Sequence, residues 1–218
     1  MTTTGPGIPA VRPAETRDRI LKAAELLFAE YGVYAVSNRQ VAEAAGQRNT
    51  SAVGYHFGTK QDLVAAIFEK HNDAIERYRV ELLKETDGSS DIREWVGCLV
   101  RPYIHHLEMQ GVETSYARFS AQVMTEPSLR QALSTIALSS PTLRATLRGL
   151  RECVSELPET VQRSRADMAR HLMVHMSAER ERTSPGPDRD EANEWRAFAD
   201  DLIDAIVGLW NASVSSAR

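Results

Sequence analysis

The stretch from Ser37 to Lys60, SNRQVAEAAGQRNTSAVGYHFGTK, contains two short helical patterns separated by a glycine and a run of polar residues. Ser37 and Gln40 have the Ser-x-x-Gln spacing of a capping box, which predicts that the first helix begins at Ser37. Gly46 is expected to end this helix, because glycine readily adopts the backbone conformation found at helix C-termini. The stretch therefore predicts two small helices joined by a tight turn.

The second short helix is expected to begin at Asn49 or Thr50, which are both good N-cap residues, and to end near Phe57. At about 100° per residue, Val53 and Phe57 point toward one side, where they can join a small core. The opposite face is small, polar or aromatic and consists of Ser51, Gly54 and Tyr55. Such a face contributes little to the protein's own core, so we expect it to meet another molecule.

Longer helices are predicted on both sides of this stretch. Residues 15–31 place apolar side chains on one face at helical spacing, and Thr59 and Asp62 form a second capping pattern before a long helix. Two short helices that follow a longer one are the arrangement of a helix-turn-helix unit. The second short helix of such a unit can enter the major groove of DNA, which is wide enough for one α-helix.

Helical patterns continue through the rest of the chain, and no segment shows the period-two alternation of a β-strand. We therefore predict an all-α protein of about nine helices, with a helix-turn-helix domain over residues 15–60 and a helical body over residues 61–213. Residues 1–14, rich in Thr, Pro and Gly, are predicted to form a disordered tail. The helical segments expected beyond residue 90 are 91–109, 113–124, 127–138, 141–157, 158–181 and 190–213.

Composition and charge restrict the class of protein. The chain has 218 residues, of which 42% are hydrophobic and 26% are charged, as is ordinary for a globular protein. Residues 1–60 hold seven basic and five acidic residues, whereas residues 61–218 hold nineteen and twenty-five. A mildly basic N-terminal quarter on an acidic body is compatible with one local DNA-facing surface.

The targeting signals and the cysteines also carry predictions. No apolar run reaches the roughly 18 residues that a transmembrane helix needs, and the N-terminus lacks the apolar core of a signal peptide. We therefore expect a cytoplasmic protein without a membrane partner.

Cys98 and Cys153 lie in helical apolar patterns without metal-binding spacing, so we interpret them as buried free thiols, with a redox switch as the alternative.

Residues 15–70 resemble the N-terminal domain of the TetR family of bacterial transcriptional regulators. The matching segments are ILKAAELLFAEYG in the first helix, SNRQVAEAAG in the second, and NTSAVGYHFGTKQDLVAAIF across the third and fourth. The aromatic-His-Phe-Gly-Thr-Lys sequence followed by Gln-Asp-Leu is the most specific part. The resemblance implies that residues 61–213 form a ligand-binding and dimerisation domain, and no cofactor is expected.

The resemblance also assigns roles in DNA binding. Lys60 stands where a family lysine contacts phosphate, and its place beside a helix N-terminus independently favours a phosphate site. His56 stands where a family side chain reaches the DNA backbone. The predicted DNA-binding residues are Ser37, Arg39, Arg48, Asn49, Thr50, Ser51, Gly54, Tyr55, His56 and Lys60.

This stretch departs from the family pattern in two places, and some of its residues have plainer interpretations. Gly54 replaces a tyrosine that many members carry, and the turn GQRN is one residue longer than the common form, so Arg48 can take over contacts. Tyr55 could instead be a half-buried packing residue. His56 could bridge the third and fourth helices, and Lys60 could be an ordinary surface lysine.

A cavity for a small inducing molecule between the central helices is a further implication of the resemblance. Aromatic and Met residues at helical spacing also fit an ordinary core, so both interpretations stay open. His171 and His175 could chelate zinc, but their segment offers no third ligand, and no metal site is predicted. The candidate ligand-binding residues are Trp95, Leu99, Tyr103, Tyr116, Phe119, Met124, His171 and His175, with Arg101, Arg118, His105 and His106 as possible polar groups.

The last two long helices carry long apolar stripes, and the resemblance implies that they form a homodimer. A two-fold dimer would contact two half-sites separated by about one helical turn of DNA, roughly 34–36 Å, or a multiple of it. The leading hypothesis is a repressor that binds palindromic double-stranded operator DNA as a homodimer and is released by a small-molecule effector. One alternative is a ligand sensor that acts through a protein partner without specific DNA binding. The other is an enzyme, for which the chain shows neither a nucleophile–base motif nor a Gly-rich phosphate loop.

Overall fold

The computed structural model describes residues 13–111, 114–183 and 191–215, and this part of the chain is entirely α-helical outside turns and loops. It contains ten helices, close to the number expected, and the shortest has six residues. Of the predicted tail, residues 1–12 lie outside the described residues, and so do residues 184–190, near the boundary between the last two predicted helices. The helices are α1 (Pro13–Tyr31), α2 (Asn38–Ala44), α3 (Ala52–Phe57), α4 (Lys60–Thr86), α5 (Ile92–Gln110), α6 (Tyr116–Thr125), α7 (Pro127–Ala137), α8 (Pro141–Cys153), α9 (Glu159–Thr183) and α10 (Glu191–Asn211).

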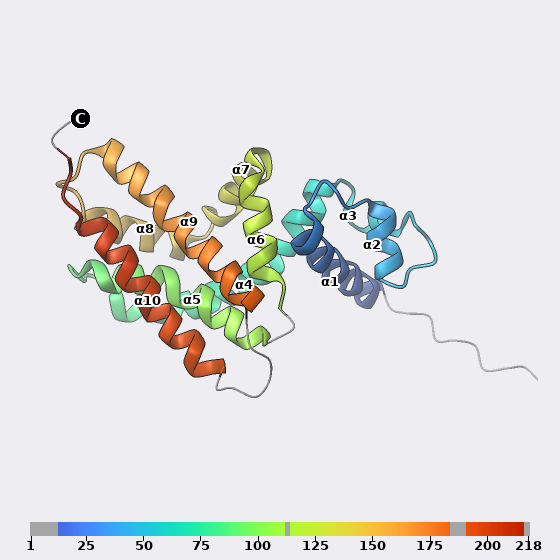
Figure 1. Ribbon diagram of the computed structural model, residues 1–218, viewed down its shortest axis with the longest axis horizontal. Helices are drawn as coiled ribbons and strands as arrows, with labels where there is room; N and C mark the ends of the chain where they lie inside the picture. The colour runs from blue at the N-terminus through green and yellow to red at the C-terminus, as the bar shows by residue number, and fades with distance from the viewer. Residues whose placement is uncertain (1–12, 112–113, 184–190, 216–218) are drawn as a thin grey trace, which may run out of the picture.

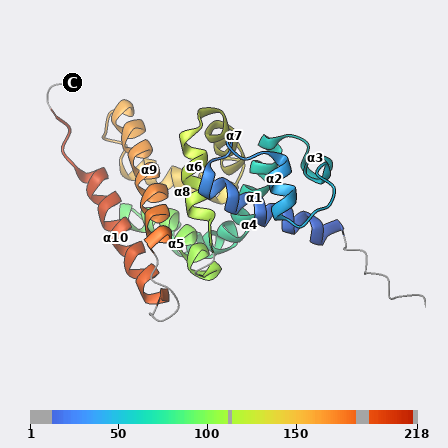
Figure 2. The ribbon, with the colours of Figure 1, turned by 45° about the vertical axis from the view of Figure 1, so that its right-hand side comes forward.

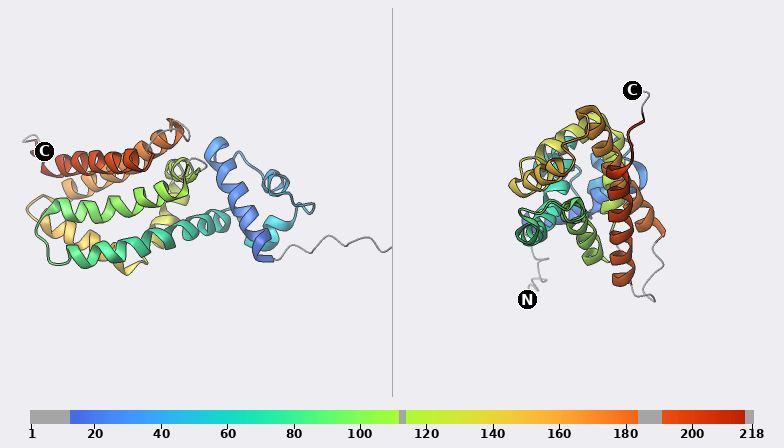
Figure 3. Two further views of the ribbon diagram at one scale, coloured as in Figure 1. Left: turned by 90° about the horizontal axis from the view of Figure 1, so that it is seen from below. Right: turned by 90° about the vertical axis from the view of Figure 1, so that its left-hand side faces the viewer.

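Helices α1, α2 and α3 form a small unit at one end of an elongated molecule (Figure 1). Helix α4 leaves this unit and enters the body, where it lies beside α5 (Figure 3). Helix α10 packs on α5 and α9, and α6 packs on both α9 and α1 (Figures 1 and 2). The small unit is therefore joined to the body by α4 along the chain and by α6 through packing.

Both predicted capping boxes are confirmed, because each depends only on residues three apart. The Gln40 amide N–H donates to Ser37 Oγ at 3.2 Å, and the Ser37 N–H donates to Gln40 Oε1 at 2.8 Å. At the start of α4, the Thr59 N–H donates to Asp62 Oδ2 at 3.0 Å and Thr59 Oγ1 accepts from the Asp62 N–H. These caps satisfy N–H groups that the first helical turn leaves unpaired.

The predicted N-cap of α3, near Asn49 or Thr50, lies one or two residues before the observed N-cap, Ser51. Helix α3 begins at Ala52, and Ser51 at its N-cap makes no side-chain capping bond. The reason is local: the Ser51 N–H donates to Asn49 Oδ1 at 2.9 Å. An asparagine that bonds the backbone two residues later forms an Asx turn, which competes with helix formation.

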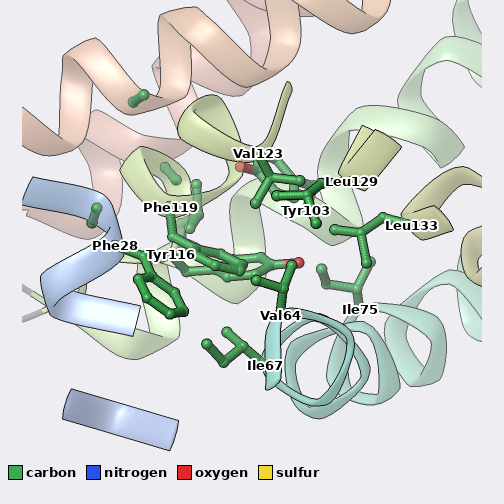
Figure 4. Packing of buried hydrophobic residues seen from close by; sticks show 14 of the residues in the cluster. Phe28, Val64, Ile67, Ile75, Tyr103, Tyr116, Phe119, Val123, Leu129 and Leu133 are labelled. Atoms are coloured by element: carbon green, nitrogen blue, oxygen red, sulfur yellow. The ribbon is translucent and has the colours of Figure 1, made fainter. Parts of the chain in front are cut away.

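One apolar core runs from the small unit into the body. Phe28 of α1 stacks on Phe119 of α6 with ring centroids 6.5 Å apart, and Tyr116 lies beside Phe119 at 6.1 Å. Val64 and Ile67 of α4 close the other side of this cluster (Figure 4). Three short helices bury too little surface to be robust alone, and the shared core supplies the remainder.

Within the residues that the structure describes, no helix is both long enough and apolar enough to cross a bilayer. Both cysteines are free thiols, with Cys98 buried and Cys153 partly buried. Burial raises the pKa of each thiol, which disfavours the reactive thiolate. The interpretation as structural thiols is therefore the better supported of the two.

Candidate nucleic-acid interface

The outward face of α3 presents one large aromatic ring to solvent. Tyr55 is 87% exposed, and its ring lies edge-on to His56 at 5.3 Å. Val53 and Phe57 are buried on the opposite side, as the helical wheel predicts. The packing alternative for Tyr55 is therefore wrong, while its contact with DNA stays a prediction.

Gly54 leaves an open space next to this ring. A Cβ atom built on Gly54 would have no neighbour within 4 Å, and the backbone is helical, so nothing in the fold requires glycine here. The residues of the preceding turn are equally accessible. Arg48, Asn49, Thr50 and Ser51 are all exposed. Turn and helix together form one continuous solvent-facing surface.

The start of α2 adds a cation to the accessible residues. The Arg39 guanidinium pairs with Glu43 at 2.8 Å, and both side chains are exposed. An exposed pair of this kind contributes little stability and is easily exchanged for another anion. Ser37 is engaged as the helix cap, and a capping hydroxyl can still meet a phosphate.

Lys60 has a structural task that the sequence did not indicate. Its ammonium donates to the backbone carbonyls of Val33, at 3.0 Å, and Val36. Burial lowers the pKa of Lys60. An ammonium has three N–H donors, so one remains for a phosphate. Lys60 thus fastens the loop before α2 to the start of α4 and is not an ordinary surface lysine, and the phosphate contact stays a prediction.

The structure brings together only some of the predicted ligand-binding residues. Tyr103, Tyr116 and Phe119 are buried in one aromatic cluster, with Tyr103 and Tyr116 6.1 Å apart (Figure 4). Trp95 is buried against α8, beside Gly149. Of the remaining candidates, Leu99 and Met124 are half-buried.

His171 and His175 lie on the accessible side of α9, where their rings stack at 5.5 Å. Among the residues that the structure describes, no group of three or more His, Cys, Asp or Glu side chains could hold a metal ion. These two histidines are therefore not part of the aromatic cluster.

A buried hydrogen-bond chain that sequence reasoning missed ties α1 to the body. His71 of α4 bonds Glu25 of α1 through Nε2 at 2.7 Å and His106 of α5 through Nδ1, also at 2.7 Å. Ser115, before α6, donates to the other Glu25 oxygen at 2.9 Å, and Tyr116 stacks on His71 at 3.9 Å. Burial alone would raise the pKa of Glu25, but its bonds to His71 and Ser115 and the positive charge nearby lower it overall.

A second tie runs beside the first. Arg118 of α6 pairs with Glu30 of α1 at 3.3 Å and with the buried Glu181 of α9 at 2.9 Å. Glu181 also accepts the N–H groups of Ala117 and Arg118 at the start of α6. Burial raises the pKa of Glu181 despite these bonds. Helix α6 is thus anchored on α9 and holds α1 from the body side.

Sequence comparisons match both halves of this architecture. Residues 20–67 match the profile of the bacterial regulatory proteins of the tetR family, and residues 97–208 match that of a tetracyclin repressor-like C-terminal domain. The HTH-type transcriptional repressor NicS of Pseudomonas putida is 30% identical over 112 residues. That alignment covers 50% of this chain and 51% of NicS, so the chain spans about half the length of this curated relative.

Solved structures share the fold at low sequence identity. The fatty acid degradation regulator FadR from Bacillus halodurans has a TM-score of 0.57 at 17% identity, over 95% of this chain and 97% of that one. AmtR from Mycobacterium smegmatis has a TM-score of 0.56 at 19% identity, over 96% and 91%. The second profile alone covers about half of the chain. The chain belongs to the TetR family, and it is therefore a DNA-binding transcriptional regulator and not an enzyme.

Proposed function

We propose that the protein is a cytoplasmic repressor that binds a palindromic operator as a homodimer and leaves it when a small-molecule effector binds the body. The observation that carries this proposal is the exposed face of α3 at one end of the molecule, with Tyr55 87% exposed (Figure 1). NicS, with which the chain shares 30% identity over half its length, is named a transcriptional repressor. The name of this relative supports repression, and not activation, as the proposed effect on transcription.

The proposed DNA contacts divide by chemistry. Tyr55 and the small residues beside it would meet base edges, where an aromatic ring can pack on a thymine methyl group. Cationic and polar groups around them would meet phosphates and fix the position of the helix in the groove. The proposed phosphate contacts are Ser37, Arg39, Arg48, His56 and Lys60, and the proposed groove contacts are Asn49, Thr50, Ser51, Gly54 and Tyr55.

The proposed homodimer would form through α9 and α10. Helix α9 exposes Met168 and Met176, and large apolar side chains that gather on a surface are typical of an interface. Helix α10 offers Ala205 and Gly208, both exposed, and a Cβ on Gly208 would meet nothing within 4 Å. Small residues let a second helix approach closely, so this pair of helices suits a two-fold contact.

The effector is proposed to act on the aromatic cluster of Tyr103, Tyr116 and Phe119. The Tyr103 hydroxyl is buried and makes at most a weak hydrogen bond, to Ser120. A buried hydroxyl without a strong partner is unfavourable, so a ligand with a polar group could be accommodated there. The cluster also touches α1 through Phe28, which gives a ligand a direct path to the DNA-binding unit.

Fluorescence anisotropy with DNA that flanks the protein's own gene would test DNA recognition. We expect saturable binding to one fragment that weakens steeply with salt, since each phosphate contact releases counterions. Tyr55→Ala should weaken specific binding by roughly ten- to a hundredfold, in line with about 1–3 kcal/mol for a good groove contact. Tyr31→Ala removes another exposed tyrosine, at the end of α1, and should leave the affinity unchanged.

Two results would contradict the proposal. One is equal affinity for the flanking fragment and for random DNA, followed by failure to enrich any sequence from a random pool. The other is equal loss of affinity in the Tyr55→Ala and Tyr31→Ala variants, since the recognition surface would then not be the face of α3.

A further inference from the structure

A hollow of about 370 Å³ lies between α4 and α5. Arg77 and Tyr78 line it from α4, and His105, His106 and Met109 line it from α5. This volume falls within the range of small-molecule sites. Met109 is 68% exposed although it is apolar, so the hollow presents both apolar and polar groups to whatever enters it.

The lining favours a planar anion. The rings of Tyr78 and His105 lie 4.4 Å apart and offer flat surfaces, and Met109 adds a polarisable apolar contact. The Arg77 guanidinium has no ion-pair partner within the described residues, and no carboxylate lines this hollow. A guanidinium binds a carboxylate through two parallel hydrogen bonds, which gives both affinity and orientation.

A second hollow, of about 380 Å³, provides the contrast. It shares Arg77, but its basic groups are accompanied by Asp18, Glu69 and Asp73. The three carboxylates offset the three basic groups Arg17, Lys70 and Arg77, so this hollow offers an anion no net positive charge. Of the two hollows, the one between α4 and α5 is therefore better suited to an acidic ligand.

The floor of the α4–α5 hollow is one end of the buried chain described above. His106 is 7% exposed, and its Nε2 is bonded to His71, which is bonded in turn to Glu25 of α1. The other ring nitrogen, Nδ1, has no protein partner in the part of the chain that the structure describes. A ligand in the hollow can therefore bond the same ring that is linked to the DNA-binding unit.

We propose that this hollow binds a small planar carboxylic acid as its anion, and that the chain His106–His71–Glu25 transmits its presence to α1. The inference rests on the proposed function and refines its effector site: the ligand occupies the hollow, whose His106 lies edge-on to Tyr116 of the aromatic cluster with ring centroids 5.7 Å apart. Arg77 would hold the carboxylate, and His106 would sense it.

The position of the proton on the His106 ring explains how ligand binding in the hollow affects the bond to His71. Burial, assisted by the charge of His71, lowers the pKa of His106 to about 4, so this ring is neutral at neutral pH. A carboxylate at Nδ1 needs an N–H there, which leaves Nε2 as an acceptor. His106 Nε2 then accepts from His71 Nδ1, so the bound carboxylate fixes the direction of the hydrogen bonds along the chain to Glu25.

Several groups surround His71 in this arrangement. Glu25 of α1 and His106 of α5 bond it, Tyr116 of α6 stacks on it, and Lys70 and Arg77 of α4 add positive charge near its two ends. A fixed donor at His71 Nδ1 holds this ring in one orientation toward Glu25, which strengthens the tie between α4 and α1. Binding of the acid therefore favours one orientation of the DNA-binding unit.

Isothermal titration calorimetry of the full chain with benzoate tests the site, and benzamide serves as the neutral analogue. Benzoate should bind saturably, because Arg77 can pair with its carboxylate. Benzamide should bind roughly tenfold more weakly or not at all. Arg77→Met should weaken benzoate binding by roughly ten- to a hundredfold, whereas Arg148→Met, which removes an exposed arginine of α8, should not.

A separate experiment tests the coupling between the hollow and the DNA-binding unit. His106→Phe keeps a flat ring in the floor but cannot bond His71, so benzoate should still bind this variant through Arg77 without changing operator affinity. Equal benzoate affinity in the parent and Arg77→Met would overturn the site. Failure of benzoate, phenylacetate and cinnamate to bind would overturn the ligand class, even if operator binding without ligand still supports the proposed function. Benzoate binding that Arg77→Met weakens, without any operator binding, would support the site and overturn the proposed function instead.

Discussion

Gly149 and Gly54 are both helical glycines, yet their surroundings give opposite expectations. A Cβ on Gly149 would overlap the buried indole ring of Trp95, which is held in place by a hydrogen bond from its Nε1 to the Ser89 carbonyl at 2.9 Å. Gly149→Ala should therefore lower the free energy of unfolding by about 1–3 kcal/mol through overpacking. Gly54→Ala should raise it by about 0.5–1 kcal/mol, because nothing lies near the new methyl group and alanine favours the helix. Urea unfolding measures both, and a Gly149→Ala variant as stable as the parent would contradict the close packing of α8 on Trp95.

His106 should make stability depend on pH. Its folded pKa of about 4 lies below the ordinary value of 6.5, so between these values the unfolded chain binds a proton that the folded chain does not. Stability should therefore fall as pH decreases through this window, by roughly 3 kcal/mol in total. His106→Gln, which does not titrate, should flatten the decline. Glu25 acts in the same direction only below about 4.5, because its folded pKa is lowered from that value.

The measurement is urea unfolding of the parent and His106→Gln at a series of pH values from neutral down to about 5. The comparison of the two proteins cancels the other titrating groups, including Glu181, whose pKa burial raises. Parallel pH curves for the two proteins would show that His106 is not the group responsible.

At the scale of elements, the C-terminal end of α10 depends on one side chain of α9. Arg165 is buried and donates to the Trp210 carbonyl at 2.6 Å and to the Ala212 carbonyl at 2.5 Å. Arg165→Met should cost about 2–4 kcal/mol of stability, because it leaves these carbonyls without a charged donor. Arg163→Met, two residues earlier, removes only an exposed pair with Glu159 at 3.6 Å and should change stability by at most about 0.5 kcal/mol. Thermal unfolding of the two variants side by side checks this difference.

Short-range sequence patterns predicted the helices well. Contacts between residues distant in the sequence explain the features that these patterns missed. The caps at Ser37 and Thr59 depend on residues three apart, so the sequence was sufficient for them. The start of α3 was misplaced because Asn49 can cap a helix or close an Asx turn, and spacing does not decide between the two. The outward position of Tyr55 followed from helical phase alone.

The chain of Glu25, His71 and His106 could not be derived in the same way, since its members are 46 and 35 residues apart. One signal was available. His71 continues the four-residue spacing of Leu63, Ile67 and Ile75, so a titratable ring occupies an apolar stripe. A buried histidine at such a position needs partners, but only the fold identifies them. The same holds for Lys60, whose carbonyl partners depend on the path of a loop.

At the scale of the whole molecule, the proposed dimer determines how much DNA one protein can recognise. Met168→Glu places a charge on the exposed face of α9 and should shift the protein toward monomer, because a charge buried at an apolar contact is unfavourable. Operator affinity should fall with it, since a monomer contacts a single half-site. Leu138→Glu, at the exposed C-cap of α7, is the matched control and should remain dimeric. Sedimentation velocity distinguishes the two, and a Met168→Glu dimer as tight as the parent would place the interface elsewhere.

The single uninterrupted course of α4 has a mechanical consequence. Its 27 residues, at about 1.5 Å each, make a rod about 40 Å long whose first turn is fastened to the DNA-binding unit by Lys60. A tilt of about 5° at the far end of such a rod displaces its near end by about 3.5 Å, which is close to the roughly 3.4 Å between successive base pairs. A change of angle too small to disturb the packing of the body therefore moves the DNA-binding unit by one base-pair step. In a homodimer the two displacements add. The distance between the two half-sites that the dimer fits therefore depends on a change of angle about 40 Å away.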